Sequence, residues 1–503
     1  MKKIIWLIAL LSASSIAAAA ATITEDDYRR LVALESPAIS PDGKDAAVVV
    51  TRILWDADKR GSDLVLVDLA TLAQRTLIAN REGLSSPAFS PDGTRVAFLA
   101  DEGTGKDAHA QIFVMPLDGG APRAVTHDKA DVDQFAWRPD GGAFAYAASD
   151  PDPQRIGADR FHDSFIFTTE PIVAREFPQP AHIFTVSLDD GTTTQLTVGA
   201  QSIATGEAQS TLSWSADAKT IAFTLVPNAI LNDQSYSRVA LLDVATKTVH
   251  PLTGRTAWEG DPLFSPDGAH IAYSCAKGDS QVNLVQLCVT TPAGGIGTRV
   301  SAAVDRPVSD AAWSHDSQSL LFTAPDRATI ALYRATLDGP PVQLDLGGIN
   351  VASSLRGAIA GNGTVVFVGS ATKQPPELFA RTPDGTTTKL TDFNAAIAAL
   401  DLSSAQRITF PTSTGTRADG VLYIPPGFER GKKCPLVVFI HGGPTSSSAL
   451  TFSLWAQVMA ARGWLVLQPN YRGSDDLGLA YQRAVLYDPE DGPGKDIMAA
   501  VRA

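Results

Sequence analysis

The chain has 503 residues, enough for more than one domain, and 44% of them are hydrophobic, which is ample for a packed core. The 41 Lys and Arg residues against 54 Asp and Glu give a formal net charge of −13, with no long charged run. This balance excludes nucleic acid as a partner, because phosphate binding needs a clustered basic face. The three cysteines and eight histidines have no zinc-binding spacing, and we expect neither a metal nor a cofactor.

Residues 1–21 have the parts of a secretory signal peptide. Lys2 and Lys3 precede an apolar run over residues 4–11, and an alanine-rich stretch up to Ala21 offers small residues for cleavage. The apolar run is well short of the roughly 20 residues of a membrane span, and no cysteine follows it for lipid attachment. We therefore expect an exported, periplasmic protein without a stable membrane anchor.

An internal repeat organises residues 22–398. Apolar strand residues flank a Ser-Pro-Asp-Gly-like turn at intervals of roughly 50 residues, with one longer interval between the third and fourth copies. Ser, Pro and Gly at the first, second and fourth positions suit a type I turn, so each copy is predicted to be a β-hairpin. The copies are SPAISPDGKDAAVVV (36–50), SPAFSPDGTRVAFLA (86–100), QFAWRPDGGAFAYAA (134–148), TLSWSADAKTIAFTL (211–225), DPLFSPDGAHIAYSC (261–275), DAAWSHDSQSLLFTA (310–324) and the weaker GAIAGNGTVVFVGS (357–370).

A second strand-turn-strand pattern follows each hairpin, so each unit has four antiparallel strands. Seven such units predict a seven-bladed β-propeller, in which ring closure protects the sheet edges. A β-solenoid or a β-sandwich would not produce the long superperiod. The second pattern occupies residues 63–78, 111–126, 182–197, 238–253, 283–301, 331–345 and 377–391.

The longer interval contains an insertion over residues 151–180 that is rich in charged residues, among them Glu170 and Glu176. Insertions on a rigid scaffold often bind ligands, and a solvated, salt-bridged loop is the alternative. Cys275 and Cys288 lie on adjacent predicted strands in registers that do not face each other. We therefore expect both to be buried thiols rather than a disulfide.

Residues 399–503 have a different pattern. Two antiparallel strands are expected within 406–428, followed by an apolar strand over 434–440 that should be buried on both faces. A helix over 450–463, a strand from 464 and an amphipathic helix from Gly494 complete an alternation typical of a mostly parallel α/β sheet. The last helix has no stop signal, and we expect this domain to be incomplete.

Three short motifs in this region carry a resemblance. A propeller of SPDG blades followed by HGGP (441–444), PNYRGS (469–474) and DGPGKD (491–496) resembles the prolyl oligopeptidase family of serine peptidases, especially acylaminoacyl-peptidase and dipeptidyl-peptidase-like members. The resemblance implies an all-β seven-bladed propeller followed by a partial α/β-hydrolase domain. It also implies hydrolysis of short peptides by a serine, a histidine and an aspartate, without a metal or cofactor.

The resemblance also assigns candidate site residues. The N–H of Gly443 is the expected oxyanion donor, with Gly442 in the same substrate-binding loop and His441 shaping that loop. Arg472 either braces the site from below or forms a structural ion pair. Glu170 and Glu176 would bind a substrate amino terminus, although they are six residues apart where dipeptidyl relatives have adjacent glutamates.

The nucleophile is missing from this pattern. No Gly-x-Ser-x-Gly elbow occurs in the sequence, and in the family the serine, aspartate and histidine would follow residue 503. We therefore expect the chain as given to be inactive. Two alternatives remain: a TolB-like propeller that binds a partner without catalysis, and an esterase of the same fold. The residues do not choose between dipeptidyl and acylaminoacyl release, and they do not set the oligomeric state.

Overall fold

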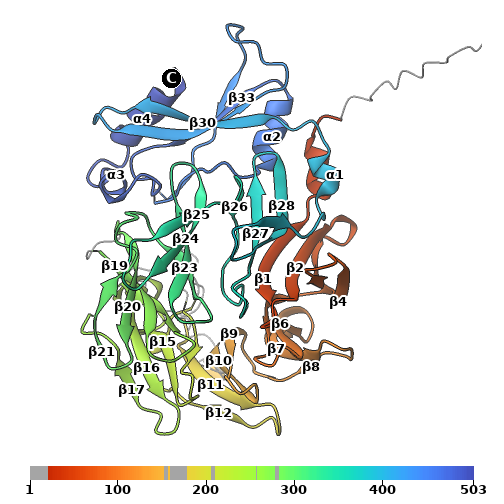
Figure 1. Cartoon of the computed structure of the whole chain (residues 1–503), viewed down its shortest axis with the longest axis vertical. Coiled ribbons are helices and arrows are strands. Elements are labelled where there is room, and N and C mark those ends of the chain that lie inside the picture. The colour runs from red at the N-terminus through yellow and green to blue at the C-terminus, as the bar shows by residue number, and fades with distance from the viewer. Residues whose placement is uncertain are drawn as a thin grey trace, which may run out of the picture.

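The computed structural model describes residues 21–151, 157–158, 178–205, 210–255, 258–277, 282–443 and 445–503. Seven antiparallel sheets follow one another along the chain, and an eighth sheet, formed by the C-terminal residues, lies above them in Figure 1. The predicted all-β seven-bladed propeller followed by an α/β domain is therefore confirmed as the fold class. The last propeller strand ends at Lys389, and the first strand of the C-terminal sheet begins at Ser404.

Each of the first seven sheets is one blade and comes from one continuous stretch of chain. The strands of blades 1 to 4 are β1 (Ala33–Ile39), β2 (Asp45–Leu54), β3 (Lys59–Asp68), β4 (Gln74–Arg81), β5 (Ser85–Phe89), β6 (Arg95–Glu102), β7 (His109–Pro116), β8 (Arg123–Ala124), β9 (Val132–Trp137), β10 (Ala143–Ser149), β11 (Ala181–Ser187), β12 (Thr193–Gln195), β13 (Ser202–Ile203), β14 (Ser213–Trp214), β15 (Thr220–Val226), β16 (Arg238–Asp243) and β17 (Val249–Pro251). The strands of blades 5 to 7 are β18 (Glu259–Phe264), β19 (Ile271–Ala276), β20 (Val285–Thr291), β21 (Gly294–Arg299), β22 (Ser309–Trp313), β23 (Ser319–Pro325), β24 (Ile330–Thr336), β25 (Val342–Leu344), β26 (Asn350–Val351), β27 (Val365–Ala371), β28 (Gln374–Arg381) and β29 (Thr387–Lys389). Short 3₁₀ helices accompany them: η1 (Glu25–Arg29), η2 (Trp55–Ala57), η3 (Gly105–Asp107) and η5 (Leu231–Tyr236).

The middle strands of the blades are buried on both faces, because each blade packs between two others. In β2, Val48 and Val50 pack toward blade 7, whereas Ala47 and Val49 pack toward blade 2. This alternation with period two explains why the second strand of each repeat is almost wholly apolar. Every consecutive pair of blades shares such a core, and blade 7 shares one with blade 1, which closes the ring.

The repeated turns have the geometry that the motif predicts. Gly43 and Gly93 occupy the left-handed region with φ of 75° and 71°, which glycine adopts without a steric cost. Blades 4 and 6 place Ala218 (φ 58°) and Ser317 (φ 61°) at the same position, where a Cβ is disfavoured. The first Ser of the turn donates to the Asp two residues later, as Ser40 Oγ does to Asp42 Oδ1 at 2.7 Å.

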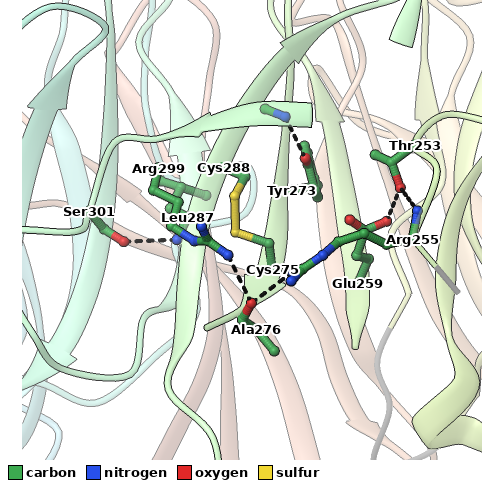
Figure 2. The surroundings of a disulfide bond; sticks show 11 residues. Thr253, Arg255, Glu259, Tyr273, Cys275, Ala276, Leu287, Cys288, Arg299 and Ser301 are labelled. Atoms are coloured by element: carbon green, nitrogen blue, oxygen red, sulfur yellow. Dashed lines mark hydrogen bonds between the residues drawn. A yellow bond between two sulfur atoms is a disulfide. The ribbon is translucent and has the colours of Figure 1, made fainter. Parts of the chain in front are cut away.

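The expectation of free thiols at Cys275 and Cys288 is wrong, because the two form a disulfide (Figure 2). Their strands pair so that Cys275 faces Gln286 and Cys288 faces Tyr273. The cysteines are thus diagonal neighbours on one face of the β19–β20 hairpin. The Cα atoms are 6.0 Å apart, within the range that a disulfide can bridge. The sequence reasoning considered only directly opposed residues. Cys434 is a free cysteine.

The C-terminal sheet has the order β30-β31-β33-β32. Only β32 and β33 run parallel, joined through α2, and the other two pairings are antiparallel, so the described sheet is not mostly parallel. Helix α2 packs on one face with Val466, and α4 packs on the other with Leu467. The elements are α1 (Ala395–Ala398), β30 (Ser404–Pro411), β31 (Arg417–Ile424), β32 (Leu436–Val438), α2 (Leu454–Ala461), β33 (Leu465–Asn470), α3 (Leu479–Arg483) and α4 (Asp491–Arg502).

The strand expected over residues 434–440 is shorter and less buried than predicted. Strand β32 covers only three residues, and Leu436, Phe439 and Ile440 are 37%, 40% and 54% exposed. The reason is its position: β32 is an edge strand of the described sheet, paired with β33 alone. Burial on both faces requires neighbours on both sides and a layer above and below.

A turn of blade 6 joins the propeller to the C-terminal sheet. Ala328, 1% exposed, belongs to the hydrophobic cluster of Val466 and α2. Its carbonyl accepts from the N–H of Leu450 at 2.8 Å, and Asn350 Nδ2 donates to the carbonyl of Leu450 at 2.9 Å. The side chain of Gln457 on α2 reaches blade 7 by donating to a backbone carbonyl at 2.7 Å. The two domains therefore share buried apolar and polar contacts.

Candidate active site

The loop that follows β32 presents exposed backbone. The N–H of Phe439 still pairs with the carbonyl of Leu467 at 2.8 Å, and the chain then leaves the sheet. Gly442 and Gly443 are exposed, and the Gly443 amide donates to no described residue. Gly443 has φ of +125°, and a Cβ there would lie 2.8 Å from the amide nitrogen of Thr445. Glycine is therefore required for this backbone conformation.

Two aromatic contacts hold this loop in place. The hydroxyl of Tyr471 donates to the backbone carbonyl of His441 at 2.7 Å. The two rings stack with centroids 4.6 Å apart and an interplanar angle of 13°. Tyr471 is buried, at 7% exposure, in the segment directly after β33. The end of one strand thus fixes the loop at the end of its parallel neighbour, which pre-organises the Gly443 amide.

His441 also contacts a serine, which is the pairing of a nucleophile with its base. Its Nε2 lies 3.0 Å from Ser474 Oγ, and its Nδ1 lies 3.0 Å from the carbonyl oxygen of Gly442. Since a carbonyl only accepts, Nδ1 carries the proton and Nε2 accepts from the Ser474 hydroxyl. Burial lowers the pKa of His441 below its ordinary value, which favours this neutral form. Ser474 is 0% exposed, so this pair positions the loop and does not attack a substrate.

Arg472 faces the protein and not the exposed loop. Its Nε and Nη2 each donate to the carboxylate of Asp496 at 2.8 Å, and Nη2 also donates to Ser413 Oγ at 2.6 Å. Asp488 Oδ2 lies 3.5 Å from Nη1. Asp496 is 0% exposed, and this two-pronged pair joins α4 to the end of β33. Of the two interpretations of Arg472, the structure shows the ion pair.

Gly492 makes room for this guanidinium. A Cβ at Gly492 would lie 2.4 Å from Asp488 Oδ2 and 2.6 Å from Arg472 Nη1, whereas a Cβ at Gly494 would meet nothing within 4 Å. The N–H of Gly492 donates to Asp488 Oδ1 at 2.9 Å. The first glycine of the DGPG stretch is therefore a packing requirement of the Arg472 ion pair, and the second is not.

A buried carboxyl pair lies next to the loop anchor. Asn470 Nδ2 donates to Asp419 Oδ1 at 2.9 Å and to Asp476 Oδ2 at 3.0 Å, and all three residues are 0% exposed. Asp419 forms an ion pair with Arg407 at 2.6 Å. Burial, and then the charge of Asp419, raise the pKa of Asp476 to about 8. Asp476 also accepts from the N–H of Ala328 at 3.1 Å, which connects the site to blade 6.

The other predicted site residues are not brought together with this loop. Glu170 and Glu176 lie outside the described residues, so their role remains a prediction. Sequence reasoning missed Tyr471, Ser474 and Asp476. The only signal was the run of polar residues that directly follows the apolar strand β33.

No helix among the described residues has the length and apolar character needed to cross a membrane. The described residues also contain no group of three or more His, Cys, Asp or Glu side chains placed to hold a metal ion.

Comparison with known proteins finds a family match and peptidase relatives. The sequence model of the prolyl oligopeptidase family matches residues 450–503, which include the Arg472 pair and its partner helix. The uncharacterized peptidase YuxL of Bacillus subtilis is 26% identical, across 95% of this chain and 75% of its own length. Dipeptidyl-peptidase 5 of Porphyromonas gingivalis is 24% identical, across 95% of this chain and 72% of its own. Residues 450–503 thus match the prolyl oligopeptidase family, and most of the chain is similar to proteins named as peptidases.

Solved structures support the same architecture. The acylaminoacyl peptidase of Pyrococcus horikoshii superposes with a TM-score of 0.75 at 18% identity, across 96% of this chain and 72% of the solved one. At this identity the likeness shows the fold alone. The family resemblance carried by HGGP, PNYRGS and DGPGKD is confirmed, and the structure explains these motifs: the first is the exposed loop, and the other two hold the ion pair beneath it.

Proposed function

We propose that this protein is a serine-type peptidase of the prolyl oligopeptidase family that acts on short peptides. The observation that carries the proposal is the exposed Gly443, whose N–H has no hydrogen-bond partner among the described residues, on a loop held by Tyr471 and Ser474. A rigid donor of this kind suits the oxyanion that forms when a peptide carbonyl is attacked. The family match over residues 450–503, and the relatives named as peptidases, support peptide bonds as the target.

The propeller restricts access to this loop. The segment that anchors the loop continues into Asp476, whose backbone carbonyl accepts from the N–H of Arg327 in blade 6 at 3.2 Å. The contact is close, since a Cβ at Gly478 would lie 2.5 Å from Asp305 Oδ2 of the propeller. The loop therefore belongs to the end of the sheet that rests on the propeller. We propose that folded proteins are excluded and that short peptides enter.

Hydrolysis by the product of the whole gene tests the proposal. The gene is expressed to its own stop codon, and the product is offered dipeptide p-nitroanilides, acyl-amino-acid p-nitroanilides and p-nitrophenyl esters. Turnover of an anilide supports a peptidase. Turnover of esters alone would favour the esterase reading, and peptide binding without turnover would favour a binding propeller. Dipeptidyl and acylaminoacyl release are distinguished by which anilide is cleaved.

The 503-residue chain is tested in the same assay, as its expected negative control. No Gly-x-Ser-x-Gly stretch occurs in it, so no residue of this chain is assigned as the nucleophile. We expect that this chain leaves a fluorophosphonate probe unreacted and does not cleave the anilides. Covalent labelling of the 503-residue chain would contradict this expectation and would direct attention to the serines around His441.

We also propose that the protein is exported to the periplasm. The pattern of residues 1–21 motivates this, and the Cys275–Cys288 disulfide fits an oxidising compartment. Cell fractionation and N-terminal sequencing of the purified protein test it. Export predicts a mature terminus near residue 22 in the periplasmic fraction. A cytoplasmic protein that retains Met1 would overturn it.

A further inference from the structure

A cavity lies inside the propeller, apart from the Gly443 loop. It has a volume of about 470 Å³ and is bounded by the inner strands of blades 4, 5 and 6 and by one arginine from blade 7. A cavity of this size suits a small ligand. Its charged, amide and aromatic lining residues are Trp258, Glu259, Asp261, Gln286, Asp310 and Arg356.

Strand bulges bring two of the carboxylates into this cavity. The pairing of β18 with β19 shifts register between Gly260 and Leu263, and that of β22 with β23 shifts in the same way. Asp261 and Asp310 occupy the two bulges with φ of 48° and 55°. A bulge removes a residue from the ladder and re-aims its side chain. Arg356 Nη2 pairs with Asp261 Oδ1 at 2.9 Å, whereas Asp310 has no ion-pair partner among the described residues.

The second observation is the buried side-chain amide of Gln286. Residues at the equivalent position of other blades can be compared with it. Gln111, His182, Gln286 and Glu377 occupy one equivalent position, directly before a residue whose N–H donates to a Ser or Thr hydroxyl of the same blade. Gln111 binds backbone groups of its own blade at 2.9 and 3.2 Å, Glu377 accepts two backbone amides, and His182 contacts a threonine hydroxyl.

Gln286 alone among these four has an amide without a partner. The residue is 1% exposed, and within the described part of the chain neither its Nε2 nor its Oε1 has a hydrogen-bond partner. A buried amide left unpaired is costly. Three blades satisfy this position internally, whereas blade 5 turns it toward the cavity. Such a group is expected where something other than the protein completes its hydrogen bonds.

The cavity also carries excess negative charge. Glu259 is 1% exposed, and its Oε2 accepts from Thr253, but its Oε1 has no partner among the described residues. Arg356 also attracts Asp310, and Arg255 attracts Glu259, but no described residue forms an ion pair with either carboxylate. The lining itself therefore holds three carboxylates against one guanidinium. Burial raises the pKa of the Glu259 and Asp310 carboxyls.

We propose that this cavity binds a small organic cation, with its ammonium or guanidinium group close to Asp310 and Glu259 and its remaining polar atoms hydrogen-bonded to Gln286. The site is separate from the peptidase loop, and the proposal does not depend on the proposed function. A cation supplies both the missing counter-charge and the hydrogen-bond donors that carboxylates accept. Trp258 adds an aromatic surface of the kind that attracts cations.

Calorimetric titration of the 503-residue chain tests the charge requirement. The probe is 1,4-diaminobutane, and 1,4-butanediol is the neutral control of the same length. We expect saturable binding of the diamine at one site and none of the diol. Asp310→Asn should weaken binding about tenfold to a hundredfold. Asp118→Asn, which removes the same charge from an exposed position, should leave the affinity unchanged. Equal affinity for both probes, or equal losses in both variants, would overturn the proposal.

Gln286→Leu tests the amide while keeping the fold. Replacing a buried unpaired amide by an apolar side chain of similar size should raise the melting temperature of the ligand-free chain. The same change should weaken binding of the diamine about tenfold. A ligand-binding role predicts both effects together. A variant that melts lower and still binds with the original affinity would show that Gln286 serves the structure of blade 5 only.

Discussion

Two glycines of α4 provide a matched test of the ion pair beneath the site loop. A Cβ at position 492 would come within 2.6 Å of Arg472 Nη1 and 2.8 Å of Arg472 Cδ, so the guanidinium has to move. Its partner Asp496 is fully buried, and breaking a buried ion pair costs about 3–5 kcal/mol. Alanine returns about 0.5–1 kcal/mol of helix propensity. We therefore expect Gly492→Ala to destabilise the protein by about 2–4 kcal/mol.

Gly494→Ala is the control, because its Cβ meets nothing within 4 Å. It should stabilise the protein by up to about 1 kcal/mol, from helix propensity alone. Urea unfolding followed by circular dichroism measures both, and the two midpoints should move in opposite directions. A Gly492→Ala variant that unfolds at the same urea concentration as Gly494→Ala would refute the reasoning. It would mean that the Arg472 pair adapts at no cost.

Three further changes test other parts of the structure. Asp476 holds a proton in the folded state up to about pH 8 and loses it near 3.9 when unfolded. Between these pH values the free energy of unfolding should fall by about 1.4 kcal/mol per pH unit. Urea unfolding at pH 5 and pH 8 should show that Asp476→Asn removes this pH dependence. The same pH dependence in the variant and the unmodified protein would contradict the prediction. Ala218→Gly should stabilise the protein and Gly93→Ala should destabilise it, each by about 1 kcal/mol, because both turns require φ near 60–70°. Calorimetric melting temperatures should therefore shift in opposite directions for the two variants. Thiol titration of the unfolded chain should find one free thiol before reduction and three after it, and reduction should cost about 2–3 kcal/mol of stability because it opens the Cys275–Cys288 loop; three thiols without reductant would contradict the disulfide.

The propeller was predictable because its information is local and repeated. Five of the seven turns keep Ser-x-Asp, which fixes a hairpin by its own side-chain bonds, as Ser40 and Asp42 show. The seven hairpins together specify the ring. The apolar second strands follow from packing between two blades. The Cys275–Cys288 disulfide was missed because diagonal neighbours are set by register and twist, which a pattern of single residues does not contain.

The site was only partly predictable, for a related reason. HGGP indicated an exposed glycine loop, and the structure places Gly443 on one. The side chains that hold this loop come from the end of a different strand, β33. Nothing in the sequence around Tyr471 or Ser474 indicates a contact with a residue 30 or more positions away. The exposure of Ile440 was likewise mispredicted, because hydropathy does not show whether a strand lies at the edge of its sheet.

Kinetics of Gly443 variants in the product of the whole gene test the central claim most directly. Replacing Gly443 by glycolic acid turns its amide into an ester, which removes the N–H without adding a side chain at φ +125°. If that N–H stabilises the oxyanion, kcat for a peptide anilide should fall about 10²–10³-fold, while Gly494→Ala, outside the loop, stays close to the unmodified enzyme. An unchanged kcat for the ester variant would contradict the account.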